Sequence, residues 1–305
     1  MPRSLLLTCP PVVAYSVAAS VIVVCSSRSR CSPLPGGLPR SSTYPVVVDC
    51  ASLPCSLRLR TRFTLVPPVV LLESNTYTSG TTWHAAGLVG LGRGTSAETA
   101  LSLGGAALYD QLEEDTGLNP GFKRCGSVNV ARTADRMEAF KRQLVRAKAY
   151  GIEGYIISPK ECGEYYAGID GVDLLRTDDL VGGVWWPADG SGSPTDLTNA
   201  MLRGAKQRGA RLFDRTAVDK FLTSRNAATG VEYITGVETT KGTIAADVVV
   251  LCAGQWSRQI AAQHNVSVPL HSAEHYYIIT QPIEGVHHEL PVMRDPDGRL
   301  VETNE

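Results

Sequence analysis

The order of apolar and polar positions along the chain predicts an α/β protein. Residues 69–73 and 248–251 are short runs of Val and Leu that lack alternating polar positions. Such runs are typical of strands in a parallel sheet, because helices cover both faces of that sheet. A helix is expected at residues 134–149, and another after a cap at Thr195 or Asp196. Strands therefore alternate with helices, as they do in a doubly wound domain.

A second, inserted sheet is also expected. Residues 126–131, with the sequence GSVNVA, alternate as a half-buried strand does. The helix at 134–149 would cover this sheet with one apolar side. That side consists of Met137, Phe140, Leu144 and Val145. The basic residues of the helix are expected to form a solvated face and not a nucleic-acid site.

The loop after the first apolar run carries the most informative residues. Glu73 ends the run, and residues 80–88 follow as GTTWHAAGL, with His84 among small residues. An acid at the end of a strand can accept hydrogen bonds from a ribose diol, and small residues let a diphosphate approach the backbone. The pattern indicates a dinucleotide site. The alternatives are a glutamate that only ends a core strand and an ordinary hydrogen-bonded histidine.

The segment VVLLESNTYTSGTTWHAAGL resembles the sarcosine and dimethylglycine dehydrogenase branch of the FAD-dependent amine oxidoreductases, a D-amino-acid-oxidase-like family. The resemblance covers residues 67–305. It continues, in the same order, through LEEDTGLNPGFKRCGSVNVA, AKAYGIEGYIISP, GGVWWPADGSGSPTDLTNAMLRGAKQRGA, VVVLCAGQWS, AEHYYIITQPI and LPVMRDPDGR. It implies an FAD-binding Rossmann-like parallel sheet with an inserted antiparallel substrate-side sheet. The substrate-side parts would be residues 120–190 and 265–305.

The resemblance also implies which residues bind the cofactor. His84 takes the position whose imidazole carries flavin covalently in the family. The implied cofactor-binding residues are Glu73, Thr81, Thr82, His84, Gly87, Val218, Ala253 and Gly254. Among them, Glu73 would hold the ribose and the Val218 backbone would meet the adenine. The two threonines would lie on the phosphate side, and Gly254 on the side of the flavin ring.

Two residues on the substrate side are candidates for catalysis. Residues 273–283 are expected to form a strand, whose alternation puts His275 and Tyr277 on one face. In the resembling enzymes an H-x-Y-x-x-T strand faces the flavin ring, and ordinary sheet packing is the alternative. Arg294 could pair with a substrate carboxylate, because guanidinium binds carboxylate through two hydrogen bonds. A turn at residues 295–298 explains the same stretch without a ligand.

The activity that the resemblance implies is oxidation of an N-methylated amino acid such as sarcosine or dimethylglycine. In the family a hydride passes from the N-methyl carbon to the flavin, and the resulting iminium is hydrolysed or passed to folate. Electrons then leave through an electron-transferring flavoprotein, and the expected location is the mitochondrial matrix. Two alternatives remain open. One is a non-catalytic homologue that resembles the regulatory subunit of pyruvate dehydrogenase phosphatase, and the other is an inactive fragment.

Residues 1–66 do not share this resemblance. They contain five of the eight cysteines, one acid and no lysine, and residues 12–24 form an apolar run. That run is shorter than the roughly 20 residues that a membrane span needs. We expect this atypical segment to be disordered, a secretory or mitochondrial targeting peptide, or sequence from a mispredicted gene start.

A glycine motif that such a domain needs is missing from the sequence. A flavin domain of this type begins with a strand that leads into G-x-G-x-x-G, whose backbone N–H groups meet the pyrophosphate. The pair Gly36-Gly37 lies between prolines, which indicates a turn. The chain also ends at DPDGRLVETNE, where the family continues. We therefore expect an oxidoreductase domain at residues 67–305 that is incomplete at both ends.

Composition narrows the choice of partners. With 305 residues, 43% hydrophobic and 19% charged, the chain can form one large or two modest domains. The net charge of -1 argues against a general nucleic-acid binder. The cysteines show no C-x-x-C pair and no zinc spacing, so no metal site is expected. The expected partners are a small amine substrate and an electron-transferring flavoprotein, without nucleic acid or membrane.

Overall fold

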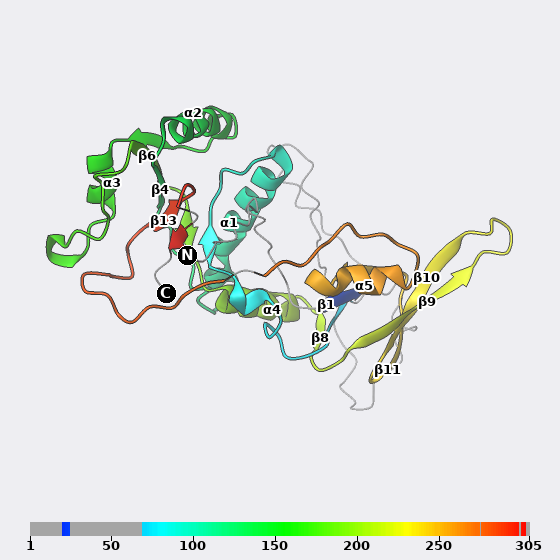
Figure 1. The fold of residues 1–305 in the computed structure, drawn as a ribbon. Helices are drawn as coiled ribbons and strands as arrows, with labels where there is room; N and C mark the ends of the chain where they lie inside the picture. Colours follow the sequence, from blue (N-terminus) through cyan, green and yellow to red (C-terminus); the bar gives the residue numbers. More distant parts are fainter. Residues whose placement is uncertain (1–19, 25–68, 275, 299, 303–305) are drawn as a thin grey trace, which may run out of the picture.

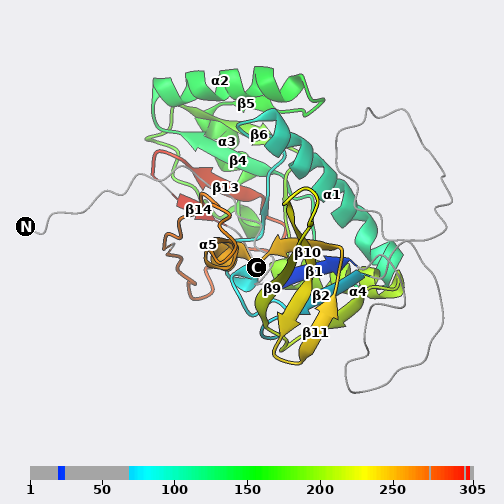
Figure 2. The same ribbon diagram turned by 90° about the vertical axis from the view of Figure 1, so that its right-hand side faces the viewer.

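The computed structural model describes residues 20–24, 69–274, 276–298 and 300–302. The strands form two groups, which lie at opposite ends of the described structure in space (Figures 1 and 2). Helix α1 (Ser96–Thr116) runs from one group toward the other. One group contains a four-stranded and a three-stranded sheet, and the other is a five-stranded sheet. This mixed architecture confirms the expected fold class.

The four-stranded sheet has the strand order β12-β1-β2-β8. Its strands are β1 (Ser20–Val24), β2 (Val69–Glu73), β8 (Arg211–Phe213) and β12 (Val248–Cys252). Strands β2 and β8 pair in parallel. The two apolar runs therefore form strands of one sheet, as their sequences predict. Most of β2 is buried, but β12, which was expected to be covered on both faces, has no buried residue.

Strand β1 lies between β2 and β12 and runs antiparallel to both. Its first residue, Ser20, is opposite Glu73 and Cys252. This strand differs from the expected disorder of residues 1–66. The physical reason is that β2 and β12 each offer a row of backbone donors and acceptors, which an extended segment can satisfy in either direction. The remainder of the segment lies outside the described residues.

The three-stranded sheet is an antiparallel meander with the order β11-β10-β9. Its strands are β9 (Val218–Arg225), β10 (Glu232–Thr239) and β11 (Gly242–Ala245). It packs on the four-stranded sheet through a buried cluster. The cluster consists of Val70, Leu72, Phe221, Val237, Ile244 and Ala246. The strand end that carries Glu73 is fixed by this packing.

The five-stranded sheet has the order β14-β13-β4-β6-β5. Its strands are β4 (Ser127–Ala131), β5 (Tyr155–Ile157), β6 (Gly182–Trp186), β13 (Val292–Asp295) and β14 (Leu300–Glu302). The strand expected at residues 126–131 is confirmed. Strands β13 and β4 pair in parallel, whereas the other neighbours are antiparallel. The inserted sheet is thus mixed, where the sequence predicted an antiparallel one.

The prediction of a strand at residues 273–283 is wrong for the described residues of this segment. Residues 273, 274 and 276–283 have no regular secondary structure, and no described strand pairs with them. The prediction failed because alternation of side chains indicates an extended backbone but does not supply a partner edge. Position 275 lies outside the described residues.

Sequence signals at the helix ends agree with the helices that form. The helices of the described residues are α1, α2 (Ala134–Lys148), α3 (Pro159–Tyr165), α4 (Pro194–Gln207) and α5 (Ser257–Ala262). Helix α1 begins with a capping box, in which Thr95 and Glu98 each accept the other's backbone N–H. Among the described residues, no helix combines the length and the apolar character that crossing a membrane requires.

Two details of the helices correct the sequence expectations. Helix α4 is capped by Ser193, whose Oγ accepts from the Asp196 N–H at 3.2 Å, and not by Thr195 or Asp196. Pro194 takes the first helical position, where its missing N–H costs nothing. In α2, Val145 is exposed and Ala147 is buried instead. Successive helical residues are turned by about 100°, so Val145 points away from the side that Leu144 occupies.

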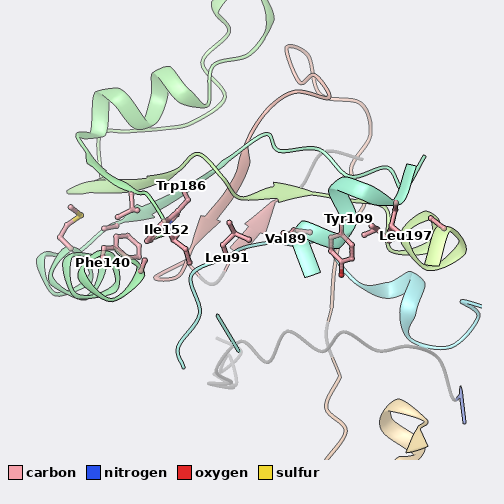
Figure 3. Packing of buried hydrophobic residues seen from close by; sticks show 14 residues of the cluster. Val89, Leu91, Tyr109, Phe140, Ile152, Trp186 and Leu197 are labelled. Atoms are coloured by element: carbon pink, nitrogen blue, oxygen red, sulfur yellow. The ribbon is translucent and has the colours of Figure 1, made fainter. Parts of the chain in front are cut away.

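The largest buried cluster joins the five-stranded sheet to three helices (Figure 3). It includes Tyr109 of α1, Phe140 of α2, Leu197 of α4 and Trp186 of β6. Val89 belongs to β3 (Leu88–Val89), which pairs with β7 (Gly190–Ser191) and also contributes to the cluster. The segment after the His84 loop is therefore packed into this core.

Candidate functional site

A pocket of about 290 Å³ opens at the carboxyl end of β2. Its lining residues come from β2, the following loop, the start of β9 and helix α5. They are Leu72, Glu73, Ser74, Asn75, Gly80, Thr216, Ala217, Val218, Trp256, Gln259 and Ile260. Ligands of open α/β sheets bind outside the carboxyl ends of the parallel strands. The pocket is therefore in the position that the sequence predicts for a nucleotide.

Glu73 is the buried acid of this pocket. The residue is 1% exposed. Its Oε1 accepts hydrogen bonds from the Asn75 backbone N–H at 3.0 Å and from Ser74 Oγ at 3.2 Å. These neutral donors hold the carboxylate at the strand end, where it borders the pocket. Glu73 is thus a buried acid at the end of a core strand and beside the pocket, and its binding of a ligand stays a prediction.

The loop after β8 is tied to the end of β2. The Thr216 N–H donates to the Glu73 carbonyl at 2.8 Å, and the Arg215 N–H donates to the Asn75 carbonyl at 2.7 Å. Arg215 has a φ of 47°, in the left-handed region that side chains other than glycine rarely adopt. This arrangement brings Val218 to the pocket wall. Val218 and Glu73 are the two predicted cofactor residues that line the pocket.

A tyrosine beside the pocket has a perturbed ionisation. Burial raises the pKa of Tyr77 to about 12, and the nearby charges of Asp214 and Glu73 act in the same direction. The phenol therefore stays protonated at any physiological pH and remains a hydrogen-bond donor. This tyrosine was not identified from the sequence, because no local pattern marks its proximity to Asp214.

Another part of the pocket lining was also missed by sequence reasoning. It consists of Trp256, which ends the short 3₁₀ helix η3 (Gly254–Trp256), and of Gln259 and Ile260 in α5. The predicted residues Ala253 and Gly254 do not line the pocket but lead into this helix. Ala253 is fully buried and its carbonyl accepts from the Trp256 N–H at 3.0 Å. A signal was present, because a helix that follows a strand at a cofactor site exposes its first turn to the ligand.

The His84 loop begins after Gly80, which is the last residue of this segment that lines the pocket. It forms a short 3₁₀ helix, η1 (Thr82–His84), in which Thr82 is buried and His84 is exposed. Thr81 precedes this turn and is half-buried. The ring of His84 lies 3.6 Å from the Trp83 ring, measured between centroids. The imidazole is therefore accessible to a large ligand and is partly supported by an indole.

Tyr277 approaches His84 from a distant part of the sequence. The two ring centroids are 6.5 Å apart in an edge-on arrangement. The structure thus brings together the predicted attachment residue and one of the two predicted catalytic residues. The other, His275, lies outside the described residues.

Neither Gly87 nor Arg294 lines the pocket. Gly87 has a φ of 69°, and a Cβ there would lie 2.5 Å from the Gly192 carbonyl oxygen. Its glycine is thus needed for chain packing, and Gly87 is not among the pocket residues. Arg294 lies on β13, in the five-stranded sheet. The turn expected after it does form, because the Gly298 N–H donates to Asp295 Oδ1 at 2.8 Å.

Comparison with known proteins gives the family. Residues 56–302 match the family model described as DAO, FAD dependent oxidoreductase. The chain belongs to this family. The solved structure of L-proline dehydrogenase from P. horikoshii has a similar fold, with a TM-score of 0.64 and 24% identity over 76% of this chain and 59% of that one. Glycine oxidase from Geobacillus kaustophilus gives a TM-score of 0.54 and 26% identity over 66% and 52% of the two chains.

Curated relatives of this FAD-dependent oxidoreductase chain are much longer than the chain itself. Mouse mitochondrial sarcosine dehydrogenase is 35% identical over 269 residues, which are 88% of this chain and 28% of the relative. Rat mitochondrial dimethylglycine dehydrogenase is 34% identical over 233 residues, 75% of this chain and 26% of the relative. The mouse mitochondrial pyruvate dehydrogenase phosphatase regulatory subunit is 36% identical over 235 residues, 76% and 25% of the two chains. The chain spans about a quarter of the length of these relatives.

The described residues fit the adenosine part of FAD. The buried carboxylate of Glu73 can accept from a ribose diol, and the apolar walls formed by Val218, Trp256 and Ile260 suit an adenine. The reversed direction of β1 means that its first residue, and not its last, lies beside Glu73. The sequence after this strand, residues 25–68, contains no G-x-G-x-x-G motif. No group of three or more His, Cys, Asp or Glu side chains suited to a metal occurs within the same residues.

Proposed function

We propose that this chain forms the flavin-binding part of a dehydrogenase that oxidises an N-methylated amino acid, such as sarcosine or dimethylglycine. The observation that carries the proposal is the meeting of His84 and Tyr277, whose rings are 6.5 Å apart. An attachment point for flavin and a substrate-side aromatic group have to lie close together in such an enzyme, since the flavin ring has to contact both. The similarity to sarcosine and dimethylglycine dehydrogenases supports the choice of substrate.

Each cofactor residue has a role in this proposal. The buried carboxylate of Glu73 binds the ribose, and the backbone of Val218 binds the edge of the adenine. Thr81 and Thr82 lie on the phosphate side, whereas Ala253 and Gly254 lie on the side of the flavin ring. Gly87 holds the loop through its packing against Gly192. The imidazole of His84 is bonded covalently to the flavin, so that the cofactor stays bound although the sequence lacks the glycine motif.

The residues of this chain orient the amine, and the cofactor supplies the redox chemistry. When bound, the flavin accepts the hydride that leaves the N-methyl carbon. Tyr277 and His275 would contact the amine beside the flavin ring, where a phenol or imidazole can hold the nitrogen by a hydrogen bond. We further propose an electron-transferring flavoprotein as acceptor and the mitochondrial matrix as location. The mitochondrial origin of the relatives supports the location. The oxidoreductase domain would comprise residues 67–305, with substrate-side parts at 120–190 and 265–305.

Retention of flavin after denaturation tests the covalent bond. The full chain is expressed, denatured in acid and separated by electrophoresis, and flavin fluorescence on the protein band is measured. We expect fluorescence in the wild type and none in His84→Ala. His288→Ala, which changes an exposed histidine elsewhere, is the matched control and should retain the flavin. A wild-type band without flavin, or a fluorescent His84→Ala band, contradicts the attachment at His84.

A non-catalytic role is a second candidate, favoured by the similarity to the phosphatase regulatory subunit. A flavin-loaded protein distinguishes the two. It is mixed with sarcosine or dimethylglycine without oxygen, and bleaching of the flavin absorbance is followed. Bleaching supports the dehydrogenase, whereas a stable spectrum with both amines supports the non-catalytic candidate.

A further inference from the structure

The part of the pocket that helix α5 lines contains one amide side chain among apolar ones. Trp256 immediately precedes α5, and Gln259 and Ile260 belong to this helix. Residues three and four positions apart lie on one face of a helix, so Gln259 and Ile260 share the face of Trp256. Leu72 and Val218 add further apolar surface to the lining. Gln259 is thus a polar group beside the apolar surface that suits an adenine.

The amide of Gln259 is oriented by the backbone that leads into its own helix. In the orientation that satisfies its neighbours, Nε2 donates to the Trp256 carbonyl at 3.1 Å and to the Gln255 carbonyl at 3.2 Å. The opposite orientation would place Oε1 against these two acceptors, which is unfavourable. Oε1 is therefore the polar atom of this amide that can meet a ligand, and it is an acceptor.

The other polar side chains of the pocket belong to its β2 end. Glu73, Ser74 and Asn75 are consecutive, and the Thr216 N–H donates to the Glu73 carbonyl at 2.8 Å. Thr216 Oγ1 itself donates to a backbone carbonyl, that of Asp214, at 2.8 Å. A ribose held by Glu73 leaves the base for the apolar part of the pocket. The amide of Gln259 is the polar side chain of that part.

The hydrogen-bonding groups of purines decide which base such an acceptor selects. In adenosine the 6-amino group is the only N–H donor of the base, whereas the ring nitrogens N3 and N7 accept. The carbonyl oxygen of Gln259 therefore gains a hydrogen bond from an adenine. It gains none from a purine that lacks the amine.

We propose that Gln259 selects the adenine of the cofactor, by accepting a hydrogen bond from the 6-amino group through Oε1. This inference rests on the proposed function, because that function places an adenosine in the pocket. The amine has two N–H groups, so one remains for the Val218 backbone. Gln259 thereby determines base specificity, whereas Trp256 and Ile260 supply apolar contacts that any purine can make.

Ligand-observed NMR on the full chain tests this role with nucleosides, which require neither flavin nor turnover. Adenosine is compared with purine riboside, which lacks only the 6-amino group. We expect the wild type to bind adenosine about three- to tenfold more tightly, as one hydrogen bond between neutral groups provides. Gln259→Met removes the acceptor at similar volume and should bind both nucleosides about equally. Gln259→Glu keeps an acceptor and should retain the preference.

A matched control is available in the same helix. Gln263 follows Gln259 by four residues at the end of α5, and it does not line the pocket. Gln263→Met should therefore keep the wild-type ratio of the two affinities. A variant that merely loosens the pocket weakens both nucleosides together and leaves this ratio unchanged, so the ratio separates recognition of the amine from a structural role.

The inference and the proposed function fail in different ways. Equal binding of both nucleosides by the wild type, or an adenosine preference that persists in Gln259→Met, overturns the role of Gln259 and leaves the flavin proposal intact. A wild type that binds neither nucleoside overturns the adenosine pocket, and this inference with it. A wild type that prefers adenosine but retains no flavin supports the role of Gln259 and contradicts only the covalent attachment at His84.

Discussion

The two groups of strands are stabilised in different ways. In the five-stranded sheet every residue of β4 is buried, and ion pairs such as Arg132 with Asp295 at 2.7 Å join its ends. In the four-stranded sheet, no residue of β12 is buried, and Val250 is 43% exposed. The centre of that sheet is the reversed strand β1. The five-stranded sheet thus relies on side-chain burial along β4, whereas the four-stranded sheet buries side chains of β2 and joins β12 to β2 through the backbone pairing of β1.

Truncation of a core side chain should have the largest effect. Trp186 is 2% exposed and belongs to the largest cluster. We expect Trp186→Ala to lower the free energy of unfolding by about 3–5 kcal/mol, since it removes buried contacts and leaves a cavity. Urea unfolding measures this loss. Val250→Ala, on the exposed strand, is the comparison and should cost less than about 1.5 kcal/mol. Equal losses would mean that burial does not distinguish the two sheets.

A backbone change in β1 should instead destabilise the four-stranded sheet and leave the five-stranded sheet unaffected. Proline cannot donate to a strand ladder, so Ile22→Pro should cost about 1–3 kcal/mol, because a backbone acceptor of a neighbouring strand loses its partner. Hydrogen exchange should accelerate in β2 and β12 but not in β4. Ile22→Val keeps the N–H and is the control. Unchanged protection of β2 would contradict the pairing of β1 with this strand.

The apolar patterns predicted the type of these elements correctly, but not the burial of every side chain. Residues 69–73 and 248–251 are strands and residues 134–148 are a helix, as the spacing indicates. However, no residue of β12 is buried and Val145 of α2 is exposed, because burial also depends on which elements pack against each face. Pairing is not encoded in this way. The direction of β1 and the absence of a strand at the described residues 276–283 depend on which backbone edges are available elsewhere in the chain.

The site was predictable to the extent that its residues belong to one local motif. Glu73 and Val218 line the pocket, as expected, because strand ends and the loops after them meet at one edge of a parallel sheet. Trp256 and Gln259 were missed because the prediction stopped at Ala253 and Gly254 and did not include the helical residues that follow them, although the position of that helix after a strand indicated them. The approach of Tyr277 to His84 is a contact between distant segments, which spacing alone cannot reveal.

Removal of the α1 cap should have a smaller effect, confined to the five-stranded side. Thr95 Oγ1 accepts from the Glu98 N–H, and the Glu98 carboxylate accepts from the Thr95 N–H at 3.1 Å. Thr95→Ala should therefore cost about 1 kcal/mol in urea unfolding. Thr95→Ser retains the hydroxyl and should be close to wild type. Because Tyr109 and Leu112 of α1 pack in the largest cluster, faster exchange is expected in β4 and β6 but not in β2.

The smallest expected effect is on the pH dependence of stability, through Tyr77 beside the pocket at the end of β2. The pKa of Tyr77 rises from 10.0 to about 12 on folding, mainly through burial. The folded state therefore binds this proton more tightly than the unfolded state does. Its contribution to stability is fully present below pH 10 and is lost as the pH rises toward 12.

Tyr77→Phe should flatten the pH dependence of unfolding in this window, whereas Tyr150→Phe, at an exposed position, should leave it unchanged. Titration of tyrosinate absorbance should show one late-ionising tyrosine lost in Tyr77→Phe. Identical alkaline curves for the wild type and Tyr77→Phe would mean that Tyr77 is not packed beside Glu73 and Asp214.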